Sequence, residues 1–295
     1  MEIVPIKIKN EKNHPSVNPI LPQHEFSMLI VAPKGAGKTN FICNLLLNKN
    51  FYFGYFNQVW VCSPSVDNDD KWGVVKETKH VLCENKHLQK ILSGIKKPTP
   101  DKLPQIVSNG KQDPQKKYDG KIPEADFFSN MKEVPSRIAM QNKIISNLKM
   151  KGVKHPKFAA DRILVILDDQ AGLFKNGTGP MVNYVIKHRH SNTSLIIVTQ
   201  AYKEIPKTIR TNCNSIILFN IPNLSELKVI YEENPEQMDF DTWKKCYQYC
   251  TEEQYSFMYI NNKFPQKETV HRKFIEKVHF KNNNSESAIT DTSEL

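Results

Sequence analysis

One stretch of this chain, residues 32–39, reads Ala32-Pro33-Lys34-Gly35-Ala36-Gly37-Lys38-Thr39. It follows an apolar run over residues 26–31, which predicts a short buried strand. It precedes residues 40–47, whose apolar side chains fall on one helical face. This order, in which a strand is followed by a glycine-containing loop, a Lys-Thr pair and a helix, is typical of nucleotide-binding sites. The backbone N–H groups of such a loop surround the phosphates of the nucleotide. The sequence therefore predicts an α/β fold that binds a nucleoside triphosphate at residues 32–39 and Asn40.

The polar side chains of this loop have expected roles. Lys38 is expected to reach the β- and γ-phosphates, and the Thr39 hydroxyl to hold Mg²⁺. The N-terminus of the helix adds a partial positive charge that favours the same anion. The motif begins with Ala32 instead of glycine, which limits that residue to negative φ, whereas Gly35 and Gly37 keep the freedom that the turn needs.

Length and composition are those of a globular chain with room for one α/β core. Of its 295 residues 39% are hydrophobic, and its longest apolar runs, such as residues 163–167, are far too short to span a membrane. The first residues do not show the charged segment followed by an apolar segment that is typical of a signal peptide. We therefore expect neither secretion nor a membrane partner. We predict a single domain over residues 1–280, with an arm or strand over 1–25, and a disordered polar tail over 281–295.

The positive charge is concentrated in one part of the chain. Residues 86–160 contain 16 Lys or Arg and six Asp or Glu, which accounts for the whole net charge of +10, and seven of the 18 prolines. We interpret residues 84–160 as a basic, proline-punctuated insertion. Its lysines either follow the phosphates of a nucleic acid without reading sequence or form a solvated surface, and the sequence leaves both possibilities open.

Apolar strands and amphipathic helices alternate along the rest of the chain. This pattern predicts a mostly parallel sheet with helices on both faces, followed by a C-terminal β-hairpin. Ligands of such sheets bind beyond the carboxyl ends of the strands. The expected strands are 58–64, 162–167, 194–199 and 215–220, the expected helices are 136–150, 180–188, 226–233 and 241–250, and the expected hairpin is 255–261 with 269–274.

Two of these strands end in side chains suited to phosphate chemistry. The run Ile163 to Leu167 leads directly into Asp168 and Asp169, the pattern of a Walker B strand. Asp168 is expected to hold Mg²⁺ through water, and Asp169 to orient or deprotonate the attacking water. Gln200 ends the strand 194–199 and could report the state of the γ-phosphate to neighbouring strands.

Arginine is scarce in this lysine-rich chain, with only five residues. Two of them, Arg189 and Arg210, lie on opposite sides of Gln200 in the sequence. A guanidinium inserted from a neighbouring subunit stabilises the negative charge that develops during phosphoryl transfer. Either arginine could have this role.

Together these residues resemble the FtsK–HerA superfamily of DNA-pumping ATPases. More narrowly, they resemble the viral genome-packaging ATPases of poxvirus type, found in large eukaryotic DNA viruses and virophages. The resemblance covers roughly residues 26–62 and 160–220, and it does not extend to the basic insertion or the tail. It is carried by the segments 31–39, 163–169, 187–190 with Thr199 and Gln200, and 205–212 before the strand at 216–219.

The resemblance implies a RecA-like P-loop sheet that uses ATP and Mg²⁺ and assembles as a homo-oligomeric ring, a pentamer or hexamer. It also implies translocation of double-stranded DNA, without sequence specificity, into a capsid at its portal vertex, and a location in the virion or the host cytoplasm. In the superfamily an arginine opens the strand that ends in the sensor glutamine, which favours Arg189. Members of the packaging branch also carry an arginine in a Pro-x-x-Ile-Arg stretch, which keeps Arg210 as a candidate. They often show a second aspartate where Asp169 stands.

Three other functions remain open at this point. A helicase or conjugation-type DNA pump would belong to the same superfamily. A small-molecule or nucleoside kinase would share the phosphate loop but would need an acceptor pocket and a lid, which is commonly rich in arginine. A nucleotide-dependent scaffold would bind ATP without turnover. ATP hydrolysis stimulated by duplex DNA distinguishes a motor from a kinase.

Overall fold

The computed structural model describes residues 19–48, 50–65, 71–72, 75, 124–128, 133–154, 156–174, 177–234, 238–263 and 269–278. Three predictions lie outside these residues: most of the N-terminal arm, the part of the basic insertion from 84 to 123, and the polar tail. In the described part of the chain, no helix is both long and apolar enough to cross a bilayer.

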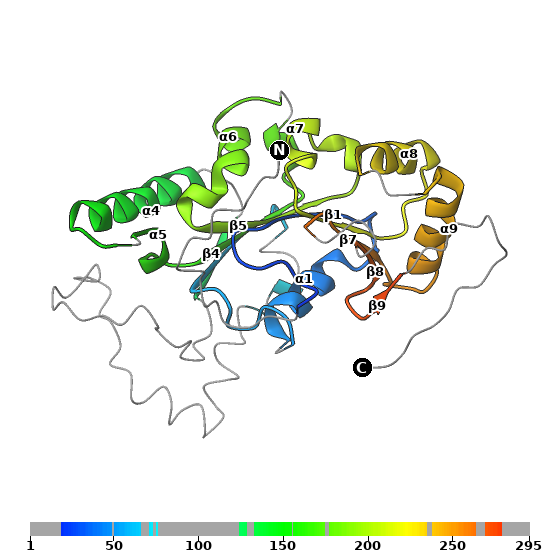
Figure 1. Cartoon of the computed structure of the whole chain (residues 1–295), viewed down its shortest axis with the longest axis horizontal. Helices are drawn as coiled ribbons and strands as arrows, with labels where there is room; N and C mark the ends of the chain where they lie inside the picture. The colour runs from blue at the N-terminus through cyan, green and yellow to red at the C-terminus, as the bar shows by residue number, and fades with distance from the viewer. Residues whose placement is uncertain are drawn as a thin grey trace, which may run out of the picture.

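One nine-stranded sheet, in the order β3-β2-β4-β5-β1-β6-β7-β8-β9, organises the described residues (Figure 1). The strands from β3 to β6 in this order pair in parallel, and β7, β8 and β9 are added antiparallel at one edge. The mostly parallel sheet and the C-terminal hairpin that the sequence predicted are confirmed. The strands are β1 (Ser27–Val31), β2 (Gln58–Cys62), β3 (Glu124–Phe128), β4 (Ile163–Asp168), β5 (Thr193–Thr199), β6 (Ser215–Leu218), β7 (Met258–Asn261), β8 (Val270–Arg272) and β9 (Glu276–Lys277).

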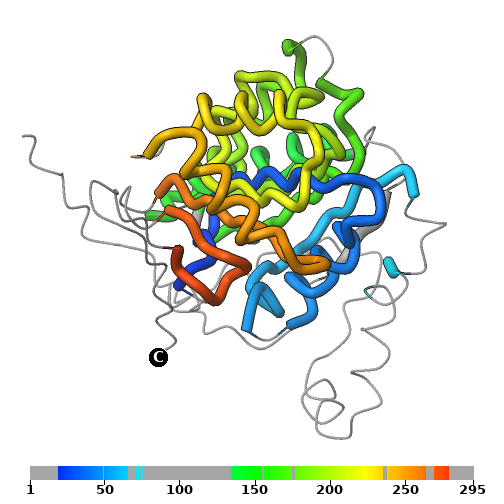
Figure 2. Tube along the Cα trace, turned by 90° about the vertical axis from the view of Figure 1, so that its right-hand side faces the viewer, coloured from blue at the N-terminus to red at the C-terminus, as the bar shows by residue number. Residues whose placement is uncertain are grey.

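Helices cover both faces of the sheet, as Figures 1 and 2 show from two directions. Helix α1 lies on one face, and α4, α6, α7, α8 and α9 lie on the other. The α-helices are α1 (Lys38–Leu47), α4 (Glu133–Met150), α5 (Pro156–Ala159), α6 (Pro180–Lys187), α7 (Lys207–Arg210), α8 (Leu224–Glu233) and α9 (Phe240–Thr251), and the 3₁₀ turns are η1 (Ala171–Phe174), η2 (His188–Ser191) and η3 (Tyr202–Glu204).

The central strand β1 shows why the two faces are both apolar. Its residues are all buried, and alternate side chains enter different cores. Leu29 and Val31 pack in the core under α4 to α9, whereas Met28 and Ile30 pack in the core under α1. A strand covered on both sides therefore appears in the sequence as a continuous apolar run instead of an alternating one.

The register of the strands brings several strand ends to one edge of the sheet. Val31, the last residue of β1, pairs with Thr199 of β5, and Asp168 of β4 pairs with Val198. Cys62, the last residue of β2, pairs with Leu167. Because these strands are parallel, the residues that follow them all emerge at this edge.

Part of the segment predicted as a basic insertion belongs to the fold itself. Strand β3 pairs with β2 along its whole length and forms the edge of the sheet. Helix α4, the amphipathic segment that the sequence predicted from 136 to 150, contributes Val134 and Ile138 to the core. Residues 124–128 thus extend the central sheet, and residues 133–150 extend its helical layer.

Candidate active site

The phosphate loop connects β1 to α1 through residues 32–37. Gly35 and Gly37 have φ values of 83° and 89°, in the left-handed region that favours glycine, and Gly37 immediately precedes the first residue of α1. Ala32 is not among the described residues with positive φ, so its methyl group is accommodated without strain. Its amide donates to the carbonyl of Thr199 at 3.0 Å, which ties the start of the loop to the end of β5.

Lys38, the first residue of α1, extends from the loop to the end of β4. Its Nζ forms a salt bridge with Oδ2 of Asp169 and lies 3.9 Å from Oδ1 of Asp168. The phosphate loop and the acidic strand end come from segments 130 residues apart in the chain, and β5 lies between their strands in the sheet. The structure therefore brings together the two motifs that the sequence predicted to share one site.

Asp168 is buried at the carboxyl end of β4, with an exposed fraction of 2%. Its Oδ2 accepts a hydrogen bond of 2.9 Å from the hydroxyl of Ser63, which follows β2. Burial, with a contribution from the negative charge of Asp168, raises the pKa of the neighbouring Cys62 thiol to about 12, which keeps that thiol neutral.

Ser63 is a site residue that the sequence analysis did not identify. The sequence showed it only as part of the Ser-Pro turn that ends a strand. The signal that would have identified it is the pairing of β2 with β4, which places Ser63 beside Asp168. This pairing is a tertiary relationship that the local pattern did not reveal.

Asp169 has a left-handed backbone with φ of 51°, and its amide donates to the carbonyl of Val198 at 3.1 Å. Aspartate is one of the residues that adopt this conformation at moderate cost. Its Oδ2 also accepts a hydrogen bond from Nε2 of Gln200 at 3.3 Å. The predicted site residues Lys38, Asp169 and Gln200 are thus in direct contact.

The donor set at this edge fits a magnesium ion. Thr39 is buried on the first turn of α1, next to Lys38, and supplies a hydroxyl group. Asp168 supplies a buried carboxylate. Mg²⁺ binds in proteins through one or two such oxygen ligands together with substrate phosphates and water. In the described residues there is no group of three or more His, Cys, Asp or Glu side chains placed to hold a metal by themselves.

Arg210 does not lie at this site but in a buried ion pair at the end of α7. Its Nη2 and Nε donate to the two carboxylate oxygens of Glu233 at 2.6 and 2.9 Å, and its Nη1 donates to the carbonyl of Ile205 at 2.7 Å. Its guanidinium also lies 4.6 Å from the centre of the Tyr202 ring. Burial acts to raise the pKa of Glu233, but the hydrogen bonds from Arg210 and Tyr202 outweigh it and lower that pKa.

Arg189 is exposed on the turn η2, which precedes β5. Gln200 follows the other end of the same strand, so the length of β5 separates Arg189 from the candidate site of its own chain. A strand of seven residues spans about 20 Å. The structure thus brings neither arginine to the site of the same chain.

The turn that carries Arg189 is held by buried polar groups. Nδ1 of His188 lies 2.6 Å from the carbonyl oxygen of Thr193, and burial lowers the pKa of His188 to about 4. Asn192 adopts a left-handed conformation and donates to the carbonyls of Ala160 and Asp161. These contacts fix the position from which the Arg189 side chain extends into solvent.

Part of the chain matches a known protein family. Residues 124–238 match the model of the family described as Poxvirus A32 protein. No curated protein matches the chain in sequence.

Among solved structures, the genome packaging NTPase B204 from Sulfolobus turreted icosahedral virus 2, in complex with AMP, is 13% identical, with a TM-score of 0.48 over 84% of this chain and 96% of that one. B204, the DNA-packaging ATPase from Sulfolobus Turreted Icosahedral Virus, is 16% identical, with a TM-score of 0.45 over 86% and 98%. The pCW3 conjugation coupling protein TcpA with ATPγS is 12% identical, with a TM-score of 0.40 over 81% and 58%. Through its match to the A32 family over residues 124–238, the chain's resemblance to the viral genome-packaging ATPases of poxvirus type is confirmed.

Proposed function

We propose that this chain is an ATP-hydrolysing motor that moves double-stranded DNA into a viral capsid. The observation that carries this proposal is the contact of Lys38 with both Asp168 and Asp169. This contact unites a phosphate loop and an acidic strand end in one site. The match to the A32 family supports the packaging role.

The phosphates of ATP bind to the amides of residues 32–40 and to Lys38. When ATP is present, the Lys38 ammonium moves from Asp169 to the phosphates, because the phosphates carry more negative charge than one carboxylate. Thr39 and Asp168 would hold Mg²⁺, which would neutralise negative charge on the bound nucleotide. Ser63 keeps the Asp168 carboxylate in position through its hydrogen bond.

Asp169 positions the attacking water and accepts its proton. Its contact with Lys38 keeps the carboxylate paired until a nucleotide draws the lysine away. Gln200 donates a hydrogen bond to the same carboxylate oxygen. A movement of the Asp169 carboxylate is therefore transmitted to Gln200, which follows the end of β5. A change at the γ-phosphate is thereby coupled to the strand that carries Arg189 at its other end.

Arg189 is the arginine that completes the site of a neighbouring subunit. It is exposed and lies at the end of β5 remote from its own site, as a residue acting between subunits of a ring must. Arg210 instead stabilises the fold, because Glu233 and the carbonyl of Ile205 already occupy its guanidinium. This assignment predicts that the active species is a homo-oligomer, a pentameric or hexameric ring around DNA.

The experiment that tests this function measures the ATPase rate with and without linear duplex DNA, together with the particle mass in MgATP. A motor shows a rate that rises with duplex DNA and a mass of five or six chains. A rate that rises only with a small-molecule acceptor would indicate a kinase, and ATP binding without turnover would indicate a scaffold. Packaging is separated from a helicase or conjugation-type pump by testing whether purified empty capsids of the virus bind the ring.

A further inference from the structure

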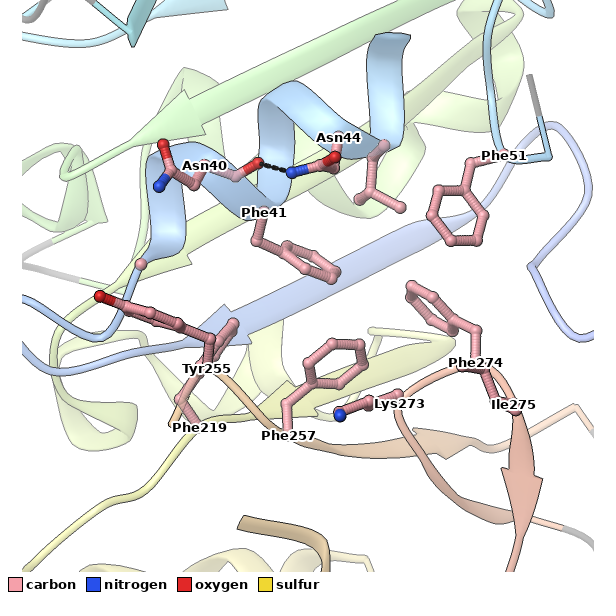
Figure 3. Close-up of a pocket in the computed structure, with 12 residues that line it drawn as sticks. Asn40, Phe41, Asn44, Phe51, Phe219, Tyr255, Phe257, Lys273, Phe274 and Ile275 are labelled. Carbon is pink, nitrogen blue, oxygen red and sulfur yellow. Dashed lines mark hydrogen bonds between the residues drawn. The ribbon is translucent and has the colours of Figure 1, made fainter. Parts of the chain in front are cut away.

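A pocket of about 360 Å³ opens beside the first turn of α1 (Figure 3). Gly37 and Asn40 form its edge next to the phosphate loop, and Phe41 extends into it from α1. Tyr255 and Phe257 line it from the C-terminal part of the chain. The volume lies in the range of about 300–1,000 Å³ that is usual for sites of small organic ligands. Through Gly37 and Asn40 the pocket borders the predicted phosphate site.

The inner wall of the pocket is a rigid aromatic cluster. The Phe41 ring meets Phe257 edge to face, with centroids 4.9 Å apart, and Phe219 at 5.7 Å. Phe257 and Phe274 pack in the same way at 5.1 Å. Phe219, Phe257 and Phe274 are buried, which fixes their positions. The cluster thus offers apolar surface of the kind on which a planar ring binds.

Tyr255 stands over the phosphate-loop end of this pocket. Its Cδ1 lies 2.8 Å from the position that a Cβ at Gly37 would occupy, so the ring lies directly against the loop and excludes a side chain there. The side chain is nevertheless 58% exposed. The Tyr255 ring thus contacts the loop and leaves most of its surface exposed, so a ligand can bind against it.

The backbone at Tyr255 is held in a strained conformation. Its φ is 65°, which is unfavourable for a residue with a large side chain, and such strain is concentrated at functional sites. Ion pairs fix the preceding residues: Arg272 contacts Glu252 and Glu253 at 3.2 and 3.0 Å, and Lys273 contacts Glu253 at 2.9 Å. These contacts tie the residues that precede Tyr255 to the end of β8.

We propose that Tyr255 stacks on the base of the bound nucleoside triphosphate, which enters the pocket between this ring and Phe41. This inference rests on the proposed function, since it takes the phosphates to lie at residues 32–39. The base is joined to the phosphates through the ribose alone, so it must lie within a short distance of the loop. The pocket at Gly37 and Asn40 satisfies that requirement. Stacking recognises the face of the base and not its edges, so purines are preferred to pyrimidines because their rings are larger.

The test compares two probes on the full chain: a non-hydrolysable ATP analogue with Mg²⁺, and inorganic tripolyphosphate with Mg²⁺, which has no base. Tyr255→Gly removes the ring and suits a φ of 65°, and Tyr255→Asn repeats the test with a residue that also adopts this conformation. Tyr255→Phe keeps the ring. Met140→Ala, on α4, is the matched control for loss of a half-exposed apolar side chain (50% exposed). Affinities are measured by titration calorimetry.

We expect Tyr255→Gly and Tyr255→Asn to weaken the ATP analogue by about 5- to 150-fold, the range for loss of one base–aromatic stack. Tripolyphosphate affinity should stay within about twofold, and Tyr255→Phe and Met140→Ala should resemble the wild type for both probes. Equal losses for both probes, or no loss for either, would overturn the base site and leave the phosphate site standing. A wild-type chain that binds neither probe would overturn the proposed function itself.

Discussion

The Lys38 ammonium contacts the Asp169 carboxylate, so the first residue of α1 is paired with the residue that follows β4. In the proposed mechanism Lys38 binds phosphate and Asp169 accepts a proton, and the ion pair holds the two side chains together before a nucleotide arrives. The pair would then link binding to catalysis, because a nucleotide that takes the lysine leaves the carboxylate free to act on water.

The Asp169→Asn substitution tests ATP binding and ATP hydrolysis separately. The amide cannot accept a proton and does not hold the lysine by charge, so we expect ATP affinity to be unchanged or higher and kcat to fall by about 10²- to 10⁴-fold. Equilibrium binding of ATP and single-turnover hydrolysis measure the two effects separately. Turnover close to that of the wild type would remove Asp169 from its proposed role.

Lys38→Ala removes the cation from the phosphate loop. Hydrogen bonds to charged groups contribute about 1.5–3 kcal/mol, so ATP affinity should fall by more than about tenfold, and turnover should be lost. Lys245→Ala, which removes an exposed lysine from α9, is the control for a change of one charge and should bind ATP as the wild type does. Calorimetric titration with ATP checks both variants, and normal binding by Lys38→Ala would contradict the phosphate-loop assignment.

Ser63→Ala tests the hydrogen bond between Ser63 and Asp168, which the local sequence pattern did not indicate. Without the hydroxyl, the Asp168 carboxylate loses a hydrogen bond of 2.9 Å, and loss of such a supporting contact weakens metal binding by about 10- to 100-fold. We therefore expect the ATPase rate to require a higher Mg²⁺ concentration, with recovery at saturation. Ser65→Ala, whose hydroxyl contacts Ser63 but not Asp168, should shift the Mg²⁺ requirement much less. An unchanged Mg²⁺ dependence in Ser63→Ala would show that the bond has no such effect.

Local patterns predicted the central parallel strands β1, β4 and β5 well because each contains a continuous apolar run. The runs before Ala32, Asp168 and Gln200 all became central strands with their ends at one edge, so the meeting of these three segments followed from strand direction alone. The pattern could not give the order of the strands, which depends on tertiary pairing. It therefore could not place Ser63 beside Asp168.

Two strands escaped prediction for a different reason. Strand β3 reads Glu-Ala-Asp-Phe-Phe, with no β-branched residue, and it forms a strand because the edge of β2 is available to pair with it. The basic composition around it suggested an insertion outside the sheet. Strand β9 has only two residues, which is too short for any periodicity to appear.

The sequence could not distinguish the roles of Arg189 and Arg210, but the surroundings of the two side chains in the structure differ. Arg189→Ala should keep the free energy of unfolding and lose ATP turnover, because the residue is exposed and acts on a neighbour. Mixed with Lys38→Ala chains, it should recover partial activity, since one type of interface then contains both an intact phosphate loop and an intact arginine. Absence of recovery would mean that the site is completed within one chain.

Arg210→Ala should instead lower the free energy of unfolding by about 3 kcal/mol, because it leaves the largely buried Glu233 without its ion-pair partner. Arg210→Lys should restore little of this, since lysine cannot form the two parallel bonds to the carboxylate. Denaturant unfolding measures the effect. An Arg210→Ala chain as stable as the wild type, with lost turnover that Lys38→Ala chains rescue, would make Arg210 the arginine that acts between subunits.

The low pKa of His188 makes the stability of the fold depend on pH. The folded-state pKa of about 4 is below the unfolded value of about 6.5, because burial disfavours the charged ring. The stabilising contribution is therefore fully present above pH 6.5 and is lost as the pH falls toward 4. Arg189 and Lys263 also disfavour the charged ring, and Glu25 acts in the opposite direction.

Between pH 7 and pH 5 this single group should lower the free energy of unfolding by about 2 kcal/mol. His188→Asn keeps an N–H donor near the carbonyl of Thr193 and cannot be protonated, so its stability should fall by about 2 kcal/mol less over the same interval. His190→Asn, on the same turn but exposed, should retain the pH dependence of the wild type. Urea unfolding at the two pH values checks all three chains. Equal pH dependence in His188→Asn and the wild type would show that His188 is not the group that titrates.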